Sequence, residues 1–193
     1  MKLPPLSPPD PPLDDGTVAL RPVSVTDIPD LVTACQDPDI ARWTTVPSPY
    51  SEADAEAWLA GQEAGMASGH ALGLGIVSSA GGELLGAIEV GQRGDGVGEI
   101  GYWVAPWARG RGVASAALRL LSGWAIGHLG LERLQLKADV RNEASQAVAL
   151  RAGYRREGVL RSYVELKGER RDMVMFSLLP GDRETGDRET GDR

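Results

Sequence analysis

The sequence predicts one mixed α/β (α+β) domain, in which a central sheet of about six to seven strands is flanked by about four helices. Strand-like and helix-like patterns alternate along the chain, short glycine-containing connections join strand pairs, and one long amphipathic helix follows a glycine-rich turn. The chain has 193 residues, of which 42% are hydrophobic and 24% charged, which suits a single globular domain. We expect that domain to occupy residues 17–180.

Both ends of the chain have compositions that disfavour packing. Residues 4–12 contain six prolines, so we expect residues 1–16 to form a flexible, extended lead-in. Residues 181–193 repeat the pentad Gly-Asp-Arg-Glu-Thr without any apolar residue, so we expect a solvated, disordered tail.

The first half of the domain begins with a short strand followed by two helices. Residues 17–21 form the strand, and Thr26 can cap a helix that runs to about residue 36. Ser51-Glu52-Ala53-Asp54 resembles a capping box and opens the second helix. Strands are then expected at residues 71–77, 84–90 and 98–104.

The second half of the domain repeats the alternation of helix and strand. Apolar residues at helical spacing from Val113 to Ala125 predict a helix with one core-facing side. A half-buried strand near residues 134–140 and a short helix at about residues 144–152 follow. Residues 160–166 and 172–178 are expected to pair as a closing hairpin.

The glycine-rich turn before the long helix is the strongest candidate for a ligand site. A helix start leaves backbone N–H groups unpaired at the positive end of the helix dipole, and glycine lets an anion approach them closely. The turn contains Arg109, Gly110, Arg111, Gly112, Val113 and Ala114. It lacks the Gly-Lys-Ser/Thr of a Walker loop, and Ser115 stands where a dinucleotide fingerprint needs its third glycine.

The pattern Arg-x-x-Gly-x-Ala at Arg109–Ala114 resembles the coenzyme A pyrophosphate loop of the GNAT acetyltransferases. The element order is similar to the GNAT fold over about residues 17–179. Glu99–Val104, Asn142–Ser145, Gly153-Tyr154 and Gly168-x-x-x-Asp172 resemble the branch that contains the ribosomal-protein N-terminal acetyltransferases. Arg42–Pro47 looks like the acceptor-side loop of that branch.

The resemblance implies acetyl-coenzyme A as acyl donor and a role for several residues. The strand ending at Val104 would splay from its neighbour, bind the pantetheine arm through backbone near Val104, and polarise the thioester carbonyl. Asn142 would contact a pantetheine amide while capping a helix. Ser145 would donate a hydrogen bond to the leaving thiolate. Other GNAT enzymes have a tyrosine acid where this chain has Ala149. Ser145 or solvent is therefore the remaining proton donor for the leaving group.

Two glutamates are candidates for the base that takes a proton from the acceptor ammonium. Glu99 could act directly or through water, particularly if desolvation raised its pKa. Glu165 on the closing hairpin is the second candidate. Each could instead be an ordinary surface glutamate.

Composition excludes several classes of protein. The formal net charge is −7 and the pI is about 4.9, which argues against a nucleic-acid partner. No segment has the character of a signal peptide or membrane span, and Cys35 alone cannot form an internal disulfide. We therefore expect a cytoplasmic protein in which Cys35 is a core residue. His70 and His128 lack metal-ligand spacing, so we expect no metal.

The amine acceptor is left open. A protein or peptide N-terminus leads by branch resemblance, and Trp43 and Trp107 could wall its pocket. The alternative acceptor is a small-molecule amine, such as an antibiotic or polyamine, and the donor could instead be a larger acyl-coenzyme A. A function of a different class is a non-catalytic acyl-coenzyme A sensor. The sequence does not distinguish a monomer from a homodimer.

Overall fold

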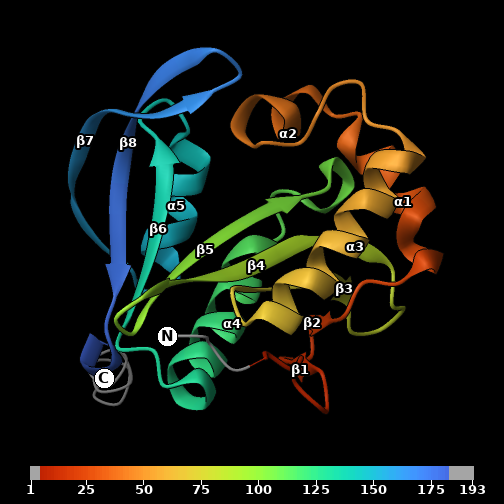
Figure 1. Cartoon of the computed structure of the whole chain (residues 1–193), viewed down its shortest axis with the longest axis horizontal. Coiled ribbons are helices and arrows are strands. Elements are labelled where there is room, and N and C mark those ends of the chain that lie inside the picture. The colour runs from red at the N-terminus through yellow and green to blue at the C-terminus, as the bar shows by residue number, and fades with distance from the viewer. Residues whose placement is uncertain (1–4, 183–193) are drawn as a thin grey trace.

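The computed structural model describes residues 5–182, which fold around one open sheet (Figure 1). The sheet has eight strands in the order β1-β2-β3-β4-β5-β6-β8-β7. All neighbouring pairs are antiparallel except β5 and β6, which are parallel. The strands are β1 (Leu13–Asp14), β2 (Val18–Arg21), β3 (Ala71–Ser78), β4 (Leu84–Gly94), β5 (Val97–Val104), β6 (Arg133–Asp139), β7 (Arg155–Leu166) and β8 (Glu169–Leu178).

Helices cover both faces of the sheet. On one face α4 packs against the central strands, with α5 beside it against β6 and β7, and on the other face α1 and α3 pack against β4 and β3. A short helix, α2, lies beside α1. The helices are α1 (Ile28–Cys35), α2 (Pro38–Trp43), α3 (Glu52–Ser68), α4 (Val113–Leu129) and α5 (Glu143–Arg151), with 3-10 turns at Val25–Asp27 and Pro106–Ala108.

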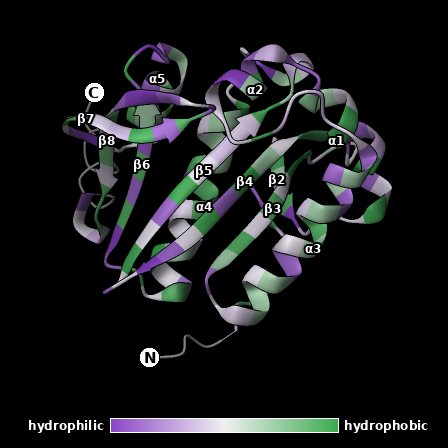
Figure 2. Ribbon diagram, turned by 45° about the horizontal axis from the view of Figure 1, so that its top comes forward, coloured by the Kyte–Doolittle hydropathy of each residue, from purple (hydrophilic) through white to green (hydrophobic). Residues whose placement is uncertain are grey.

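The alternation of residues along the strands creates two different faces. Figure 2 shows hydrophobic and hydrophilic residues alternating along the central strands. Large side chains such as Leu74, Ile88 and Ile100 are buried in the core beneath α4. On the opposite face small residues, including Gly73 and Gly101, leave room above the sheet.

The parallel pair β5 and β6 separates soon after it begins. Only Val97–Glu99 pair with Arg133–Gln135, whereas β5 stays paired with β4 as far as Val104. Beyond Glu99 the two strands therefore diverge and open a gap within the sheet (Figure 1). This confirms the splayed strand that the resemblance implied.

The structure corrects the expected lead-in. Leu6 is buried in the main core, and its N–H donates to Met66 O at 2.8 Å. Leu13–Asp14 pairs with β2 as an edge strand. The expectation of a flexible residue 1–16 segment is therefore wrong for residues 6–14, because two leucines spaced among the prolines supply the apolar anchors that composition alone concealed.

Three further differences concern elements that were short or irregular. The sheet has one strand more than the upper expectation, because β1 was missed, and α2 was also missed. The strand β7 begins at Arg155 rather than at residue 160, since its register shifts hide the alternation. Of the expected tail, residues 183–193 lie outside the described residues, while Asp182 forms an ion pair with Arg155 at 2.8 Å.

Candidate active site

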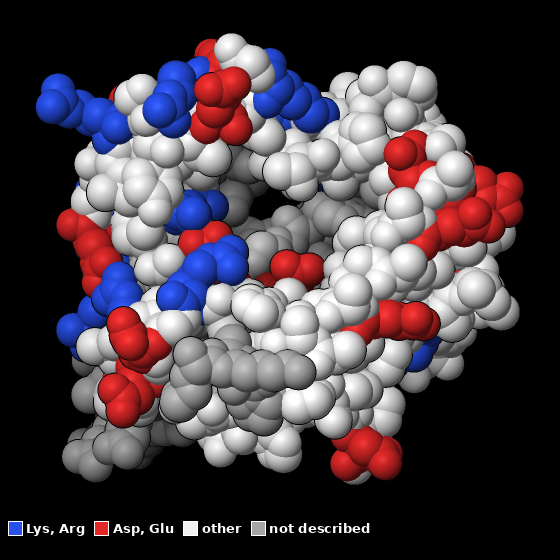
Figure 3. All heavy atoms as spheres, viewed as in Figure 1, with Lys and Arg blue, Asp and Glu red and all other residues white. Residues whose placement is uncertain are grey.

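A cleft of about 1160 Å³ lies where β5 and β6 diverge. It is lined on one side by the start of α4 and by α5, and on the other by α1, α2, α3 and the loop between α2 and α3. Figure 3 shows the molecule hollowed there, with basic side chains on the side of β6 and acidic side chains nearby. The cleft thus gives access to the separated strands from both faces of the sheet.

The glycine-rich turn forms one end of the cleft. Gly110 and Gly112 have φ of +73° and +80°, and nothing lies within 4 Å of a Cβ built on either. Gly112 is the N-cap of α4 and has no side chain to cap it, so the first N–H groups of the helix are available to a ligand. Gly110, Gly112, Val113 and Ala114 line the cleft, as does Ser115. Ser115 Oγ is buried without a hydrogen-bond partner among residues 5–182.

The two arginines of the turn do not stand free in the cleft. Arg109 donates to Asp37 Oδ1 at 2.6 Å and Oδ2 at 3.3 Å, and through Nε to Val104 O at 3.3 Å. Asp37 is also the N-cap of α2, and the hydrogen bond from Arg109 lowers its pKa. Arg111 is exposed, donates to Trp107 O at 3.5 Å, and is not among the residues that line the cleft. The guanidinium of Arg109 therefore joins the turn to α2.

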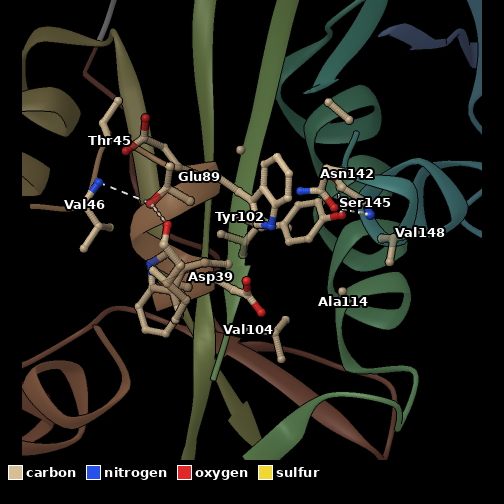
Figure 4. Close-up of a pocket in the computed structure, with 18 of the residues that line it drawn as sticks. Asp39, Thr45, Val46, Glu89, Tyr102, Val104, Ala114, Asn142, Ser145 and Val148 are labelled. Atoms are coloured by element: carbon tan, nitrogen blue, oxygen red, sulfur yellow. Dashed lines mark hydrogen bonds between the residues drawn. The ribbon is translucent and has the colours of Figure 1, made fainter. Parts of the chain in front are cut away.

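Tyr102, Ser145 and Asn142 meet on the α5 side of the cleft (Figure 4). Asn142 Oδ1 accepts the N–H of Ser145 at 3.0 Å and caps α5. Ser145 Oγ lies 3.0 Å from Tyr102 OH, and burial raises the pKa of Tyr102 to about 12. A phenol and a hydroxyl that are hydrogen-bonded to each other in this way can donate a proton to a leaving group. Sequence reasoning found Asn142 and Ser145 but missed Tyr102, which stands in the quoted Glu99–Val104 motif.

Ala149 and Val104 complete this side of the site. Ala149 is fully buried, so its side chain faces the core at the position where the resemblance led us to look for a tyrosine acid. Val104 ends β5, lines the cleft beside the turn, and accepts the hydrogen bond from Arg109.

Glu99 lies where the strands separate, and its neighbours are basic. Its carboxylate is 2.9 Å from Lys137 Nζ and 3.2 Å from Arg93, and Gln135 donates to it at 2.9 Å. Burial by itself raises the pKa of Glu99, but the hydrogen bonds from Lys137 and Arg93 outweigh it and the pKa is lowered. Desolvation therefore does not give Glu99 the raised pKa that would favour it as the base, and Glu99 is a weaker base than it would be without its basic neighbours.

Glu165 is exposed and does not line the cleft, whereas its neighbours Val164 and Leu166 do. The alternation of β7 therefore directs Glu165 away from the site.

Glu89 on β4 is a carboxylate of the cleft that sequence reasoning missed (Figure 4). It faces the side of α3, where Gln62 Nε2 donates to it at 3.1 Å. Unlike Glu99 it forms no ion pair within residues 5–182. The signal in the sequence was a single charged residue in the otherwise uncharged run Leu84–Val90.

Aromatic side chains and the hairpin of β7 and β8 enclose the side of the cleft that Glu89 faces. The lining there includes Trp43, Tyr50, Trp58 and Trp103. Trp107, expected to line it, instead donates its indole N–H to Leu84 O at 3.2 Å. The hairpin of β7 and β8 reaches toward α2 (Figure 1), where Lys167 donates to Val46 O at 2.7 Å and Arg171 to Arg42 O at 3.3 Å.

Other ligand types find little support in the described part of the chain. No group of three or more His, Cys, Asp or Glu residues there could hold a metal ion. Cys35 is buried, and burial raises its pKa to about 12, as expected of a core thiol. Among residues 5–182 no helix combines the length and the apolar character needed to cross a membrane.

A splayed parallel strand pair with a glycine-rich helix start at its open end is the arrangement of an acyl-coenzyme A acetyltransferase domain. Residues 17–155 match the family model described as an acetyltransferase (GNAT) domain. The chain belongs to this family.

Individual relatives agree with the resemblance seen in the sequence. The Bacillus subtilis protein named "Putative ribosomal N-acetyltransferase YdaF" is 41% identical over 86 residues, which are 45% of this chain and 47% of that protein. The match thus spans about half the length of such curated relatives. The structure of Mycobacterium smegmatis RimJ in complex with CoA-disulfide has a TM-score of 0.79 and 26% identity, covering 86% of this chain and 84% of that one. A GCN5-related N-acetyltransferase from Brucella melitensis has a TM-score of 0.76 and 26% identity, over 93% and 83% of the two chains.

Proposed function

We propose that the protein transfers an acetyl group from acetyl-coenzyme A to a primary amine by direct attack, and that the acceptor is a protein or peptide N-terminus. The observation that carries the proposal is the cleft itself. It joins a helix start suited to a pyrophosphate, a hydroxyl pair suited to a leaving thiolate, and a carboxylate suited to an ammonium.

In this proposal the donor enters from the side of α4 and α5. The backbone N–H groups of Gly110–Ala114 bind the pyrophosphate, and Arg111 adds positive charge at the mouth of the turn. Backbone near Val104 and the side chain of Asn142 bind the pantetheine arm within the gap. Arg109 supports the turn through Asp37 rather than contacting phosphate itself.

The acceptor amine approaches from the side of α3. Glu89 takes a proton from the ammonium, and the neutral nitrogen attacks the thioester carbonyl to form a tetrahedral intermediate. The C–S bond of this intermediate breaks as the nitrogen releases its second proton and the amide forms. Ser145, hydrogen-bonded to Tyr102, donates a proton toward the departing sulfur. The second proton of the nitrogen, relayed through solvent, replaces the one that Ser145 gives up. Glu99 acts as the base only if its charged neighbours are displaced, so we favour Glu89.

The protein N-terminus as acceptor is supported by the names of the relatives and by the resemblance of Arg42–Pro47 to the acceptor-side loop of that branch. Small-molecule amines remain the second candidate, because the aromatic lining of the acceptor side would also suit an amine with an apolar body. A cytoplasmic location, the absence of a nucleic-acid partner and the oligomeric state stay predictions.

The test is incubation of the purified chain with acetyl-coenzyme A and a panel of peptides and small amines. Mass spectrometry identifies the acetylated amine, and thiol release measures turnover. We expect acetylation at peptide α-amines. Acetylation confined to small amines would overturn the acceptor assignment. Thermal stabilisation by acetyl-coenzyme A without turnover on any amine would favour the sensor, and the absence of both would overturn the enzyme and the sensor.

A further inference from the structure

Glu89 is held by one side chain from another element. Gln62 of α3 donates its Nε2–H to Glu89 Oε2 at 3.1 Å, across 27 positions of sequence. Within residues 5–182 this is the only polar side-chain partner of the Glu89 carboxylate. The hydrogen bond therefore selects the direction in which the carboxylate points.

The same amide leaves a buried acceptor unpaired. Gln62 Oε1 is buried and has no hydrogen-bond partner in the described part of the chain. A lone unsatisfied polar atom of this kind costs folding free energy. Rotating the amide by 180° would not help, because it would place Oε1 against the carboxylate of Glu89.

The sheet provides a space for this amide. Gly73 of β3 is the cross-strand neighbour of Glu89, and a Cβ on Gly73 would lie 2.0 Å from Gln62 Oε1 and 2.5 Å from Gln62 Cδ. The amide of Gln62 thus occupies the place that a side chain at position 73 would take. Any residue larger than glycine would displace it.

The other neighbour of Glu89 is also a glycine, but its space is open. Gly101 of β5 pairs with Glu89, is exposed, and has nothing within 4 Å of a built Cβ. Gly101 lines the cleft. Glu89 is therefore supported on the side of Gly73 and accessible on the side of Gly101.

We infer that Gln62 is a positioning residue, which acts with Gly73 to fix the Glu89 carboxylate toward the open side left by Gly101, where the acceptor ammonium would bind. The inference rests on the proposed function, in which Glu89 is the base. The unsatisfied Oε1 is the structural cost of this arrangement, since an apolar side chain at position 62 would avoid it.

The pH dependence of transfer distinguishes positioning from a structural role. An N–H donor stabilises the charged form of a carboxyl group, so its removal makes that group harder to ionise. Other titratable groups of the cleft are Cys35 of α1, Asp39 of α2, Tyr50 of the loop before α3, Asp54 of α3, Glu99 and Tyr102 of β5, Lys137 of β6, Arg109 of the turn and Arg151 of α5. All of them are retained in the variants below.

The central variant is Gln62→Leu, assayed with one peptide acceptor throughout so that titration of the acceptor is the same in every profile. We expect the acid limb of kcat/KM to move to higher pH, because the variant lacks the N–H that stabilises a charged carboxylate. At neutral pH kcat should fall at least about fivefold, while the KM for acetyl-coenzyme A is unchanged. The matched control is Gln36→Leu, which removes an amide that donates to Tyr50 O at 2.6 Å. It should lower thermal stability without moving the acid limb.

Two further variants separate the possible failures. Glu89→Gln should abolish at least about 99% of the rate, and full activity in it would overturn the base assignment of the proposed function. Loss of activity in Glu89→Gln with an unmoved acid limb in Gln62→Leu would overturn only the positioning role. If Gln62→Leu fails to fold, Gly73→Ala displaces the same amide and should produce the same shift, and an unmoved limb there would overturn the inference.

Discussion

Lys137 Nζ lies 2.9 Å from Glu99 Oε2, two residues beyond Gln135, the last residue of β6 that pairs with β5. The ion pair thus joins the two strands at the point where their backbone hydrogen bonds end. Tyr163 of β7 contributes a ring whose centroid is 4.9 Å from the same ammonium. These contacts place Glu99 where the two strands begin to diverge, and there it links β5 to β6.

Glu99→Gln is expected to affect stability more than chemistry. The side chain is 17% exposed, so loss of its charge leaves Lys137 partly buried without its partner and should cost about 1–3 kcal/mol of unfolding free energy. Chemical denaturation measures this cost. We expect kcat within about threefold of wild type, because the proposed mechanism assigns the role of base to Glu89 rather than to Glu99. A loss of more than about a hundredfold in kcat with unchanged stability would restore Glu99 as the base.

Much of the fold could be predicted from the sequence because its long elements have regular patterns. The helix starting at Val113 and the hairpin of residues 71–94 depend on hydrophobic periodicity and glycine-containing connections, which are local properties. The edge strand Leu13–Asp14 could not be predicted, because two residues carry no periodicity and pair only when β2 is already in place. The helix α2 was also missed because it is short, and its six residues are too few to show a helical period.

The candidate site was predicted only where motifs are contiguous. The glycine-rich turn, Asn142 and Ser145 stand in recognisable patterns. The charged side chains that pair with the residues of the site come from distant positions in the sequence. Asp37 is 72 residues from Arg109, and Lys137 is on a different strand from Glu99. The sequence shows that a charged residue is present but not which opposite charge contacts it, so it could not show that basic neighbours lower the pKa of Glu99.

Ser145→Ala is expected to lower kcat by at least about tenfold, or 1.4 kcal/mol, because it removes the hydroxyl to which the proposed mechanism assigns protonation of the departing sulfur. Tyr102→Phe keeps the ring but removes the phenol that lies 3.0 Å from Ser145 Oγ. If the two hydroxyls act together, the double variant should be no slower than the worse single variant. Thiol release under saturating substrates provides the rates. Wild-type turnover in both single variants would leave solvent as the proton donor.

Gly112→Ala tests the helix start as the pyrophosphate site. At φ of +80° an alanine is strained by about 1–2 kcal/mol, and its methyl group lies beside the first N–H groups of α4. We expect the KM for acetyl-coenzyme A to rise at least about tenfold, with a smaller change in the KM for the amine. Calorimetric titration with coenzyme A gives the affinity directly.

Gly127→Ala is the matched control for that variant. Gly127 lies within α4, and nothing is within 4 Å of a built Cβ. Alanine there should stabilise the protein by about 0.5–1 kcal/mol and leave both KM values unchanged. Equal effects of the two substitutions on coenzyme A affinity would contradict a specific role for Gly112.

Asp139→Asn is expected to reveal an acid-sensitive contribution to stability near the end of β6. Asp139 is 6% exposed and accepts hydrogen bonds from Arg141 at 3.0 Å and from Arg171 at 3.2 Å. The hydrogen bonds from Arg141 are the main cause that lowers the pKa of Asp139 to about 2. Because the folded state holds the proton less tightly than the unfolded state, the contribution is present above about pH 4 and is lost as the pH falls toward 2.

The variant should therefore be less stable than wild type by about 2 kcal/mol at pH 7, and the difference should shrink steadily below pH 4. Urea unfolding at pH 7, 4 and 3 measures it, with Glu83→Gln as the control at an exposed hairpin position that forms no ion pair among residues 5–182. The control should show little difference from wild type at any pH. A penalty for Asp139→Asn that is the same at pH 7 and pH 3 would mean that packing, rather than the charge held by Arg141 and Arg171, is what Asp139 contributes.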